Sequence, residues 1–384
     1  MNGDVIVIGL GAMGSAACYQ FSKRGAKVIG IDRYSPPHSL GSTHGETRIT
    51  RLAIGEGQQF VPLAIRSHEI WRELESETGT DLMTTTGGLI MSSGSGHALH
   101  GNDNFLQTTI SAAVKFEIKH RVLNAADIAA EFPQFQLDGD EVGYFEDSAG
   151  FVRPERCVAT QLTLAEKHGA ELRLNERVTG VEKDRAGVRV VTDKGNYFAA
   201  TAIVAAGPWV GEFVHGMAAN LFRIYRQVLH WFDVSQKYDQ YKLGEFPIFI
   251  WSFGRWPGDF VYGFPAIDGR DGGLKVASEE YQTTTLPEQV DRSVTAEESA
   301  GIFRNYVSGK LKGVGSRCVK SAVCLYTTTP DGNFVIDWMD ENVILASPCS
   351  GHGFKHSAAI GETLAELALT GRSTIDASPF SITR

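Results

Sequence analysis

The sequence lacks several features that would assign a protein to a class at once. In its 384 residues, no apolar run approaches the roughly 20 residues that a membrane-spanning helix needs, so we expect no membrane partner. The five cysteines are scattered, which excludes a disulfide framework and a CxxC metal pattern and makes a reducing cytoplasm the simplest compartment. The net charge is −9, with 36 basic against 45 acidic residues, which argues against nucleic acid as a partner.

The composition is that of an ordinary globular protein. Apolar residues make up 42% of the chain and charged residues 21%, enough for large buried cores. The length suggests two or three domains. Because the first residues show no basic stretch and no cleavage site, we interpret them as a strand rather than a signal peptide.

The first thirty residues carry the most informative motif. A short apolar run at 5–8 predicts a strand buried on both faces, and Gly9, Gly11 and Gly14 follow in GxGxxG spacing. A helical segment and a second strand come next, and Asp32 closes that strand. In such a unit the glycines allow a tight turn, a close approach to a pyrophosphate and helix packing, while the acid binds ribose hydroxyls. The motif predicts a dinucleotide site.

Later segments favour FAD over NAD as the dinucleotide. Residues 153–172 predict a helix, and residues 173–210 read as strand, hairpin and strand, ending at Gly207. This order is typical of flavoproteins with two dinucleotide-type halves, whereas a simple NAD dehydrogenase would continue with regular βαβ units. A further strand, a glycine-rich turn and a helix near Lys355 would bind another part of the cofactor.

These elements predict a mixed α/β (α+β) fold with two domains. A Rossmann-like FAD-binding domain would be assembled from the discontinuous segments 1–84, 150–216 and 320–384. Residues 85–149 and 217–319 would form the substrate or catalytic domain.

Four stretches resemble the monomeric sarcosine oxidase and N-methyltryptophan oxidase family. They are GSTHGETRITRLAIGEGQQFVPLAIRS, VYGFP with GLK, AVCLYTTTPDGNFVID, and SGHGFKHSAAIGE, and the likeness covers nearly the whole chain. The resemblance implies an FAD-binding domain plus a catalytic domain with a mostly antiparallel sheet. It also implies a monomeric enzyme that oxidises a secondary amine of an amino acid with O₂, giving an aldehyde, an amine and hydrogen peroxide.

The resemblance further implies a covalent cofactor. In this family the cysteine of a segment like AVCLYT forms a thioether to the flavin 8α-methyl carbon, and Cys324 stands at that position. Without the resemblance, Cys324 would be read as a buried structural cysteine. The thiolate is the nucleophile, so a positive neighbour should lower its pKa, and Arg317 and Lys320 are nearby in sequence.

Three basic residues match family positions with chemical roles. Arg51 and Lys355 match the pair that anchors the substrate carboxylate, one with a planar fork and the other with a compact charge. The alternative is that Arg51 pairs with Glu46 or Glu56 on a surface segment. Lys275 matches the lysine that promotes reaction with oxygen by stabilising the developing negative charge, the alternative being a solvated strand lysine.

The remaining candidates complete the two predicted sets. Tyr262 matches a tyrosine that lines the substrate cavity, although it could simply pack with Phe264. The predicted catalytic residues are Arg48, Arg51, Tyr262, Lys275 and Lys355. The predicted cofactor-binding residues are Gly9, Gly11, Gly14, Asp32, Ser42, His44, Arg48, Val178, Gly207, Cys324, Gly351, His352, Gly353 and Lys355. No metal site is predicted, because His352 and His356 lack a partnering glutamate and lie in a glycine-rich loop.

The match departs from the family in two places. Glu279 stands where members usually carry a histidine near the substrate amine, and Ile54 replaces an aromatic residue. An acid at position 279 would favour a protonated amine over a neutral one. Either the alignment with the family slips here, or the substrate has a larger or positively charged side chain. The open alternatives are an oxidase or dehydrogenase for pipecolate, proline-like or sugar-modified amino acids. The aromatic stretch 249–256 would line a roomier pocket or form strand core.

Overall fold

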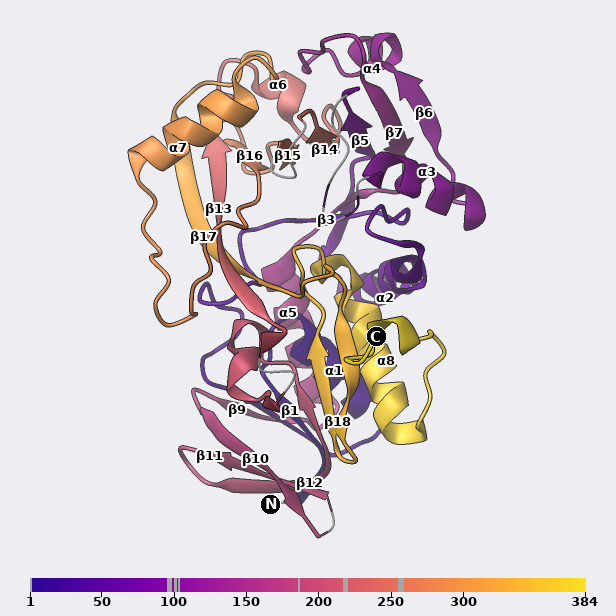
Figure 1. The fold of residues 1–384 in the computed structure, drawn as a ribbon, viewed down its shortest axis with the longest axis vertical. Helices are drawn as coiled ribbons and strands as arrows, with labels where there is room; N and C mark the ends of the chain where they lie inside the picture. Colours follow the sequence, from indigo (N-terminus) through magenta and orange to yellow (C-terminus); the bar gives the residue numbers. More distant parts are fainter. Residues whose placement is uncertain are drawn as a thin grey trace.

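The structure, a computed structural model, describes residues 2–94, 99, 102, 104–185, 187–216, 220–254 and 259–384. Two lobes follow one another along the long axis, each built on an eight-stranded sheet (Figure 1). A third sheet, of three strands, lies between them. It is formed by β3 (Arg48–Thr50), β4 (Met83–Thr85) and β8 (Gly150–Val152).

The sheet of the lower lobe gathers segments that are far apart in sequence. Its order is β10-β11-β12-β1-β2-β9, with β19 paired to β12 and β18 to β19. The strands are β1 (Asn2–Ile8), β2 (Val28–Asp32), β9 (Glu171–Leu174), β10 (Val178–Asp184), β11 (Gly187–Thr192), β12 (Asn196–Val204), β18 (Val335–Asp340) and β19 (Val343–Ser347). β1 lies between β2 and β12 and is parallel to both, which explains its continuous apolar sequence.

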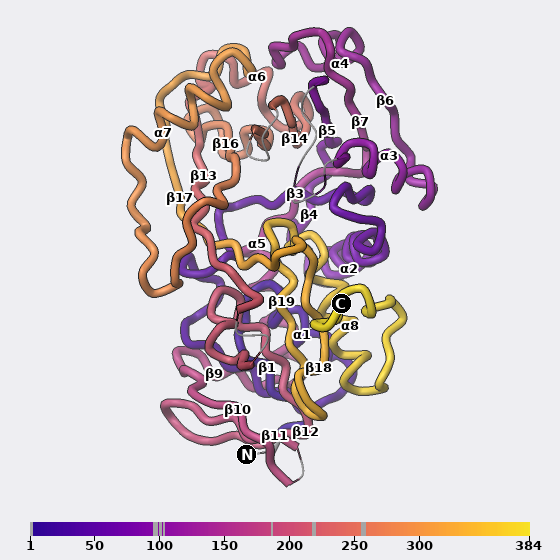
Figure 2. The backbone as a smooth tube through the Cα atoms, viewed as in Figure 1, coloured from indigo at the N-terminus to yellow at the C-terminus, as the bar shows by residue number. Residues whose placement is uncertain are grey.

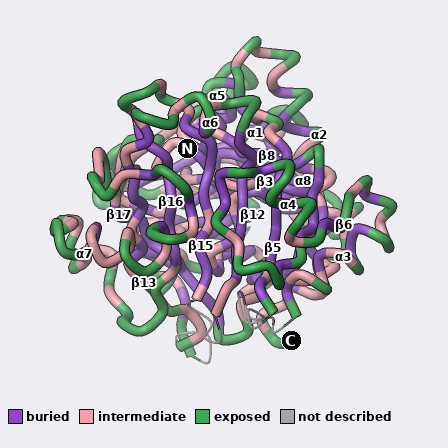
Figure 3. Tube along the Cα trace, turned by 90° about the horizontal axis from the view of Figure 1, so that it is seen from above, coloured by how far each residue is buried: buried purple, intermediate pink, exposed green. Residues whose placement is uncertain are grey.

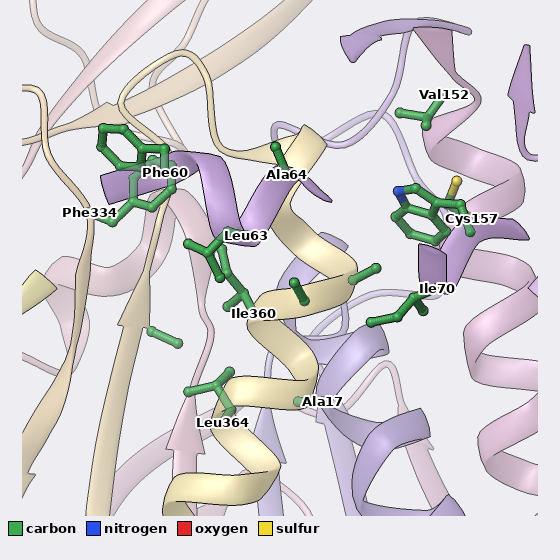
Figure 4. Packing of buried hydrophobic residues seen from close by; sticks show 14 of the residues in the cluster. Ala17, Phe60, Leu63, Ala64, Ile70, Val152, Cys157, Phe334, Ile360 and Leu364 are labelled. Carbon is green, nitrogen blue, oxygen red and sulfur yellow. The ribbon is translucent and has the colours of Figure 1, made fainter. Parts of the chain in front are cut away.

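Four helices pack in the lower half of the molecule. They are α1 (Ala12–Lys23), α2 (Val61–Thr78), α5 (Pro154–Lys167) and α8 (Ser357–Thr370). α1 packs against both α5 and α8, and α2 packs against α8 (Figure 2). Leu63 of α2 and Ile360 of α8 meet in the shared core (Figure 4). The α1–α8 contact is so close that a Cβ on Gly361 would lie 2.5 Å from the backbone of Ala16.

The sheet of the upper lobe is mostly antiparallel, in the order β17-β13-β16-β15-β14-β5-β7-β6. Only the β14–β5 pair is parallel. The strands are β5 (Gly88–Ser92), β6 (Arg121–Asn124), β7 (Val142–Glu146), β13 (Arg223–Phe232), β14 (Ile248–Ser252), β15 (Phe260–Gly263), β16 (Leu274–Ala277) and β17 (Cys318–Thr328). Helices α3 (Phe105–Lys115), α4 (Ala125–Glu131), α6 (Tyr238–Tyr241) and α7 (Ala296–Ile302) lie around it (Figure 1). The predicted mixed α/β fold is confirmed.

β17 is a long strand that runs from the upper lobe toward the middle of the molecule (Figure 1). The predicted boundary at residue 320 falls inside it, and the division into domains stays a prediction. The aromatic stretch 249–256 is divided: Phe249 and Trp251 are buried in the core of the upper lobe, while Ile250 faces the main cavity. Residues 255 and 256 lie outside the described residues.

The buried residues are concentrated in the two eight-stranded sheets. The inner strands of both lobes are buried, and most exposed segments are connecting loops and outer helical turns (Figure 3). Within the part of the chain that the structure describes, no helix has both the length and the apolar character needed to cross a bilayer.

Candidate active site

One large cavity is lined by both lobes. It holds about 1720 Å³ of empty space, part of which is open to solvent. The glycine turn after β1 lines one part of it, and Arg51 and Lys355 line another.

The glycine turn has the geometry that the motif predicts. Gly9 adopts φ +86°, a left-handed conformation that favours glycine. A Cβ on Gly14 would lie 1.7 Å from the carbonyl oxygen of Gly9, so the start of α1 can approach the turn only because this residue has no side chain. At Gly11 the nearest atom to an added Cβ is Thr43 Oγ1, at 3.6 Å, and the glycine lines the cavity. The turn and the N-terminus of α1 therefore fit a phosphate group.

Asp32 lies at the end of β2, buried and lining the same cavity. Its Oδ2 accepts a hydrogen bond from the Leu10 amide and its Oδ1 one from the Tyr34 amide, each at 2.7 Å. Each carboxylate oxygen can accept a further bond, so hydroxyl groups of a ribose can still be bound. Val178 and Gly207, also predicted as cofactor residues, line this cavity too.

The buried hydroxyl oxygens of two serines support a bound polar ligand. Ser42 Oγ and Ser347 Oγ have no hydrogen-bond partner among the described residues, and both serines line the cavity. Buried hydroxyls are rarely left without a partner, so a ligand with acceptors and donors would satisfy them. His44, predicted as a cofactor residue, is not among the residues that line the cavity; burial, and then Arg48, lower its pKa to about 4, so its ring is neutral at pH 7. These residues fit a dinucleotide such as FAD.

Arg51 and Lys355 meet at a shared acid, Glu56. Arg51 Nη2 donates to Glu56 Oε2 at 2.7 Å, and Lys355 Nζ donates to Glu56 Oε1 at 3.1 Å. All three side chains are buried, so Arg51 pairs with Glu56 in the interior rather than on a surface segment as the alternative reading supposed. Two cations and one acid leave one net positive charge, which suits a carboxylate. Burial lowers the pKa of Lys355 to about 8.

Lys275 is buried on β16 and is not a solvated strand lysine. Its Nζ donates to the carbonyl oxygens of Gly45 and Thr47 at 2.7 and 2.9 Å, and to Thr47 Oγ1 at 3.1 Å. It also lies 4.6 Å from the centre of the Phe264 ring. Burial, and then Arg48, hold the pKa of Lys275 well below its usual range. The cavity therefore contains a fixed, desolvated amine.

The cations that act on Cys324 are not its sequence neighbours. Burial raises the pKa of the Cys324 thiol, and Arg48 and Lys275 oppose that shift. By contrast, Arg317 pairs with Asp233, and Lys320 pairs with Glu46. Spatial neighbours from other strands thus supply the positive field.

Cys349 is a second thiol at the site, and sequence reasoning missed it. It lines the cavity together with Tyr326, whereas Cys324, predicted as a cofactor residue, is buried on β17 and is not among the residues that line the cavity. Its Sγ accepts a weak hydrogen bond from the Thr327 amide at 3.4 Å. Glu56 was also missed as a site residue. Its proximity to two basic motif residues is the signal that would have found it.

Tyr262 lies at the cavity and also near Phe264, so its predicted position and the alternative apply together. It lines the cavity, and its ring lies 6.2 Å from that of Phe264 at a steep angle. Burial raises the pKa of its phenol well above the usual range, and Glu279 adds to this effect. Tyr262 is therefore neutral and can donate a hydrogen bond at any ordinary pH.

The glycine-rich turn before α8 also reaches the cavity. Gly351 adopts φ +83°, and a Cβ on Gly353 would lie 1.8 Å from the Pro348 carbonyl oxygen. Gly351, His352 and Gly353 line the cavity, and His352 Nε2 contacts the Gly332 carbonyl oxygen at 3.0 Å. The described residues hold no group of three His, Cys, Asp or Glu side chains that could bind a metal ion.

Comparisons with known proteins agree with this geometry. The model of a family described as FAD dependent oxidoreductase matches residues 4–367. A monomeric sarcosine oxidase from Streptomyces avermitilis is 38% identical over 371 residues, covering 96% of this chain and 94% of the relative. An N-methyl-L-tryptophan oxidase from Yersinia pestis (strain Pestoides F) is 34% identical, covering 100% of both chains. NikD, described as an unusual amino acid oxidase essential for nikkomycin biosynthesis, shares the fold with a TM-score of 0.84 at 23% identity, covering 99% of this chain and 97% of NikD.

Proposed function

This chain belongs to the FAD dependent oxidoreductase family, and on that basis we propose that it oxidises a secondary amine of an amino acid, such as sarcosine or N-methyltryptophan. The amine would lose two electrons and two protons to give an imine, which water hydrolyses to an aldehyde and an amine. The electrons and protons would reduce O₂ to hydrogen peroxide. The observation that carries the proposal is the single cavity with a dinucleotide turn and a net-positive Arg51–Glu56–Lys355 cluster.

The residues of this chain would bind and orient the substrate. FAD, bound along the glycine turns, would supply the electron acceptor. The Arg51 fork and the Lys355 ammonium would hold the carboxylate, and the phenol of Tyr262 would fix the other end of the molecule. Ile250 and Phe264 add apolar walls that exclude water. Nearby cations favour the uncharged form of the amine, the form that can be oxidised.

Anaerobic titration tests the proposal. The purified yellow protein is mixed without oxygen with a panel of N-methyl and cyclic amino acids, and loss of the visible absorbance is recorded. We expect at least one N-methyl amino acid to remove the absorbance, and air to restore it with release of peroxide. If no secondary amine changes the spectrum, the proposal is wrong. Bleaching without peroxide release in air would instead identify a dehydrogenase.

We propose that FAD is attached covalently through Cys324. Acid precipitation of the wild-type protein should then give a yellow pellet, and Cys324→Ser should give a colourless one, because serine cannot form the thioether. Arg48 and Lys275 support this, because their charges favour the thiolate and oppose the burial that raises the pKa of the Cys324 thiol. The measurement is the absorbance of the pellet and of the supernatant.

Cys349→Ser is the matched control, because Cys349 is the cysteine that lines the cavity itself. Its pellet should stay yellow. A yellow Cys324→Ser pellet together with a colourless Cys349→Ser pellet would move the attachment to Cys349. Colourless pellets from the wild type would show that the cofactor is not covalent.

Binding of a carboxylate should weaken as the pH rises through about 8. The pKa of Lys355 is lowered to about 8, mainly by burial, so its ammonium is present below that pH and lost above it. Between about pH 7 and about pH 9 the charged fraction falls roughly tenfold, and the dissociation constant of a substrate analogue without nitrogen should rise by about the same factor. The shift in flavin absorbance on titration measures it.

Lys355→Arg separates this effect from other titrations. A guanidinium stays charged throughout this pH range, so the variant should bind the analogue with a flat profile. A wild-type profile that is already flat, or an unchanged profile in Lys355→Arg, would exclude Lys355 as the titrating group.

We also propose a monomer that works in the cytoplasm. The five free cysteines support a reducing compartment. Gel filtration with light scattering checks the monomer, and a concentration-dependent dimer would contradict it.

A further inference from the structure

Glu279 places a carboxylate in the wall of the substrate cavity. It lies two residues beyond the end of β16, the strand that carries Lys275, and it lines the same cavity as Arg51 and Lys355. The Tyr281 hydroxyl donates a hydrogen bond to Glu279 Oε2 at 2.5 Å, which fixes the position of the acid. The cavity therefore contains groups of both charges.

The basic residues and the acid differ in how far they are buried. Arg51 and Lys355 are 1% and 5% exposed, whereas Glu279 is half-buried and Tyr281 beside it is 37% exposed. The cations thus lie at a closed part of the cavity and the acid lies where its wall meets solvent. A ligand that places its carboxylate on the cations would direct another group toward Glu279.

Aromatic rings stand around the acid. Tyr262 and Tyr326 line the cavity beside Glu279, and the Tyr281 ring lies edge-on to Tyr225 at 5.4 Å. A Cβ on Gly351 would lie 3.0 Å from both the Tyr281 hydroxyl and the Tyr326 ring, so these two side chains close around the glycine turn. A carboxylate next to aromatic rings is a favourable environment for an organic cation.

The reacting amine is a poor partner for this acid. A carboxylate beside that nitrogen would stabilise its protonated form, which has no lone pair to release. A cation elsewhere in the substrate has no such conflict.

Building on the proposed function, we infer that Glu279, supported by Tyr281, binds a second, non-reacting cation of the substrate, and that the natural substrate class is secondary amino acids with a basic side chain or N-substituent. Glu279 is then a specificity residue, and neutral N-methyl amino acids are weaker substrates.

The test compares two substrates that differ in one charged group, Nα-methyl-L-lysine and Nα-methyl-L-norleucine. The wild-type protein should prefer the lysine derivative in kcat/KM by at least about tenfold, the lower end of what a hydrogen bond to a charged group contributes. Glu279→Gln should erase the preference, mainly by raising KM for the lysine derivative. Glu280→Gln, which removes an exposed acid one residue away, should retain it.

Calorimetric binding of L-lysine and L-norleucine to the holoprotein provides a readout that does not need turnover. Tighter binding of lysine that weakens with salt and is lost in Glu279→Gln supports the inference. Equal binding of the two amino acids, or equal losses in Glu279→Gln and Glu280→Gln, overturns it. If neither N-methyl derivative bleaches the protein while another secondary amine does, the inferred substrate class is wrong. If no secondary amine bleaches it, the proposed function fails, while the calorimetry still decides the role of Glu279.

Discussion

Replacing Lys275 with methionine is expected to slow the reoxidation of the substrate-reduced protein by O₂ on the order of 10²–10³-fold, the usual loss when one preorganised charge-stabilising group is removed. Lys275 is 3% exposed, and its amine is held by three oxygen acceptors of Gly45 and Thr47. In so dry a site the Lys275 amine, when it carries its proton, stabilises negative charge on oxygen far better than it would in water. Methionine keeps roughly the length of the stem and removes the amine, with its charge and its three hydrogen bonds.

Double-mixing stopped-flow measures the effect. The protein is first reduced by substrate without oxygen and then mixed with aerated buffer, so that the two half-reactions are timed separately. Reduction should change little, because Lys275 is not part of the Arg51–Glu56–Lys355 cluster that would hold the carboxylate.

Lys320→Met is the matched control for Lys275→Met. Both lysines lie over the Trp231 ring, at 4.5 Å for Lys320 and 5.4 Å for Lys275, but the Lys320 side chain is 41% exposed and pairs with Glu46. Its removal should leave reoxidation within about twofold, as expected for a solvent-screened charge. Wild-type reoxidation in Lys275→Met, or an equal loss in both variants, would exclude the proposed role.

Replacing Arg51 with alanine is expected to lower kcat/KM for an N-methyl amino acid by about 30- to 5,000-fold, the range for truncating one partner of a buried charged pair. The variant loses the Arg51 fork, while Glu56 keeps its bond to Lys355. The cluster then carries no net charge and has nothing to offer a carboxylate. Steady-state kinetics measures the loss, which should fall mainly on KM.

Comparing two substrates shows whether Arg51→Ala acts by weakening the binding of the substrate carboxylate. The wild-type protein should prefer an N-methyl amino acid to the matching amine without a carboxyl group, and Arg51→Ala should shrink that preference. Arg304→Ala removes an arginine that is paired with Glu297 at the surface, and it should change neither activity nor stability appreciably. An unchanged preference in Arg51→Ala would place the carboxylate elsewhere.

The dinucleotide half of the site was predictable because its signals are local. Gly9 and Gly14 are needed for a turn and a helix contact that involve only nearby residues and the neighbouring strand, so their spacing alone predicts the geometry. The antiparallel catalytic sheet and the basic residues followed from the family resemblance, since their positions in the sequence give no hint that they share a cavity.

What sequence reasoning missed depends on contacts between distant segments. Nothing near Cys324 in sequence identifies Arg48 and Lys275 as the cations that act on it, because they come from β3 and β16. Glu56 was considered only as a surface partner, and its burial between two cations is a property of the assembled fold. Cys349 gave no signal beyond being one of five cysteines.

The close packing of α1 against α8 has a consequence for biosynthesis. Roughly 330 residues separate the end of α1 from the start of α8, so at about 5–20 residues per second the ribosome needs on the order of 15 to 70 s to deliver the second helix after the first. During that interval the apolar flank of α1 has no cover and is open to aggregation. We expect chaperone dependence in vivo and slow refolding in vitro, because α1 must wait for a helix that lies far along the chain from it.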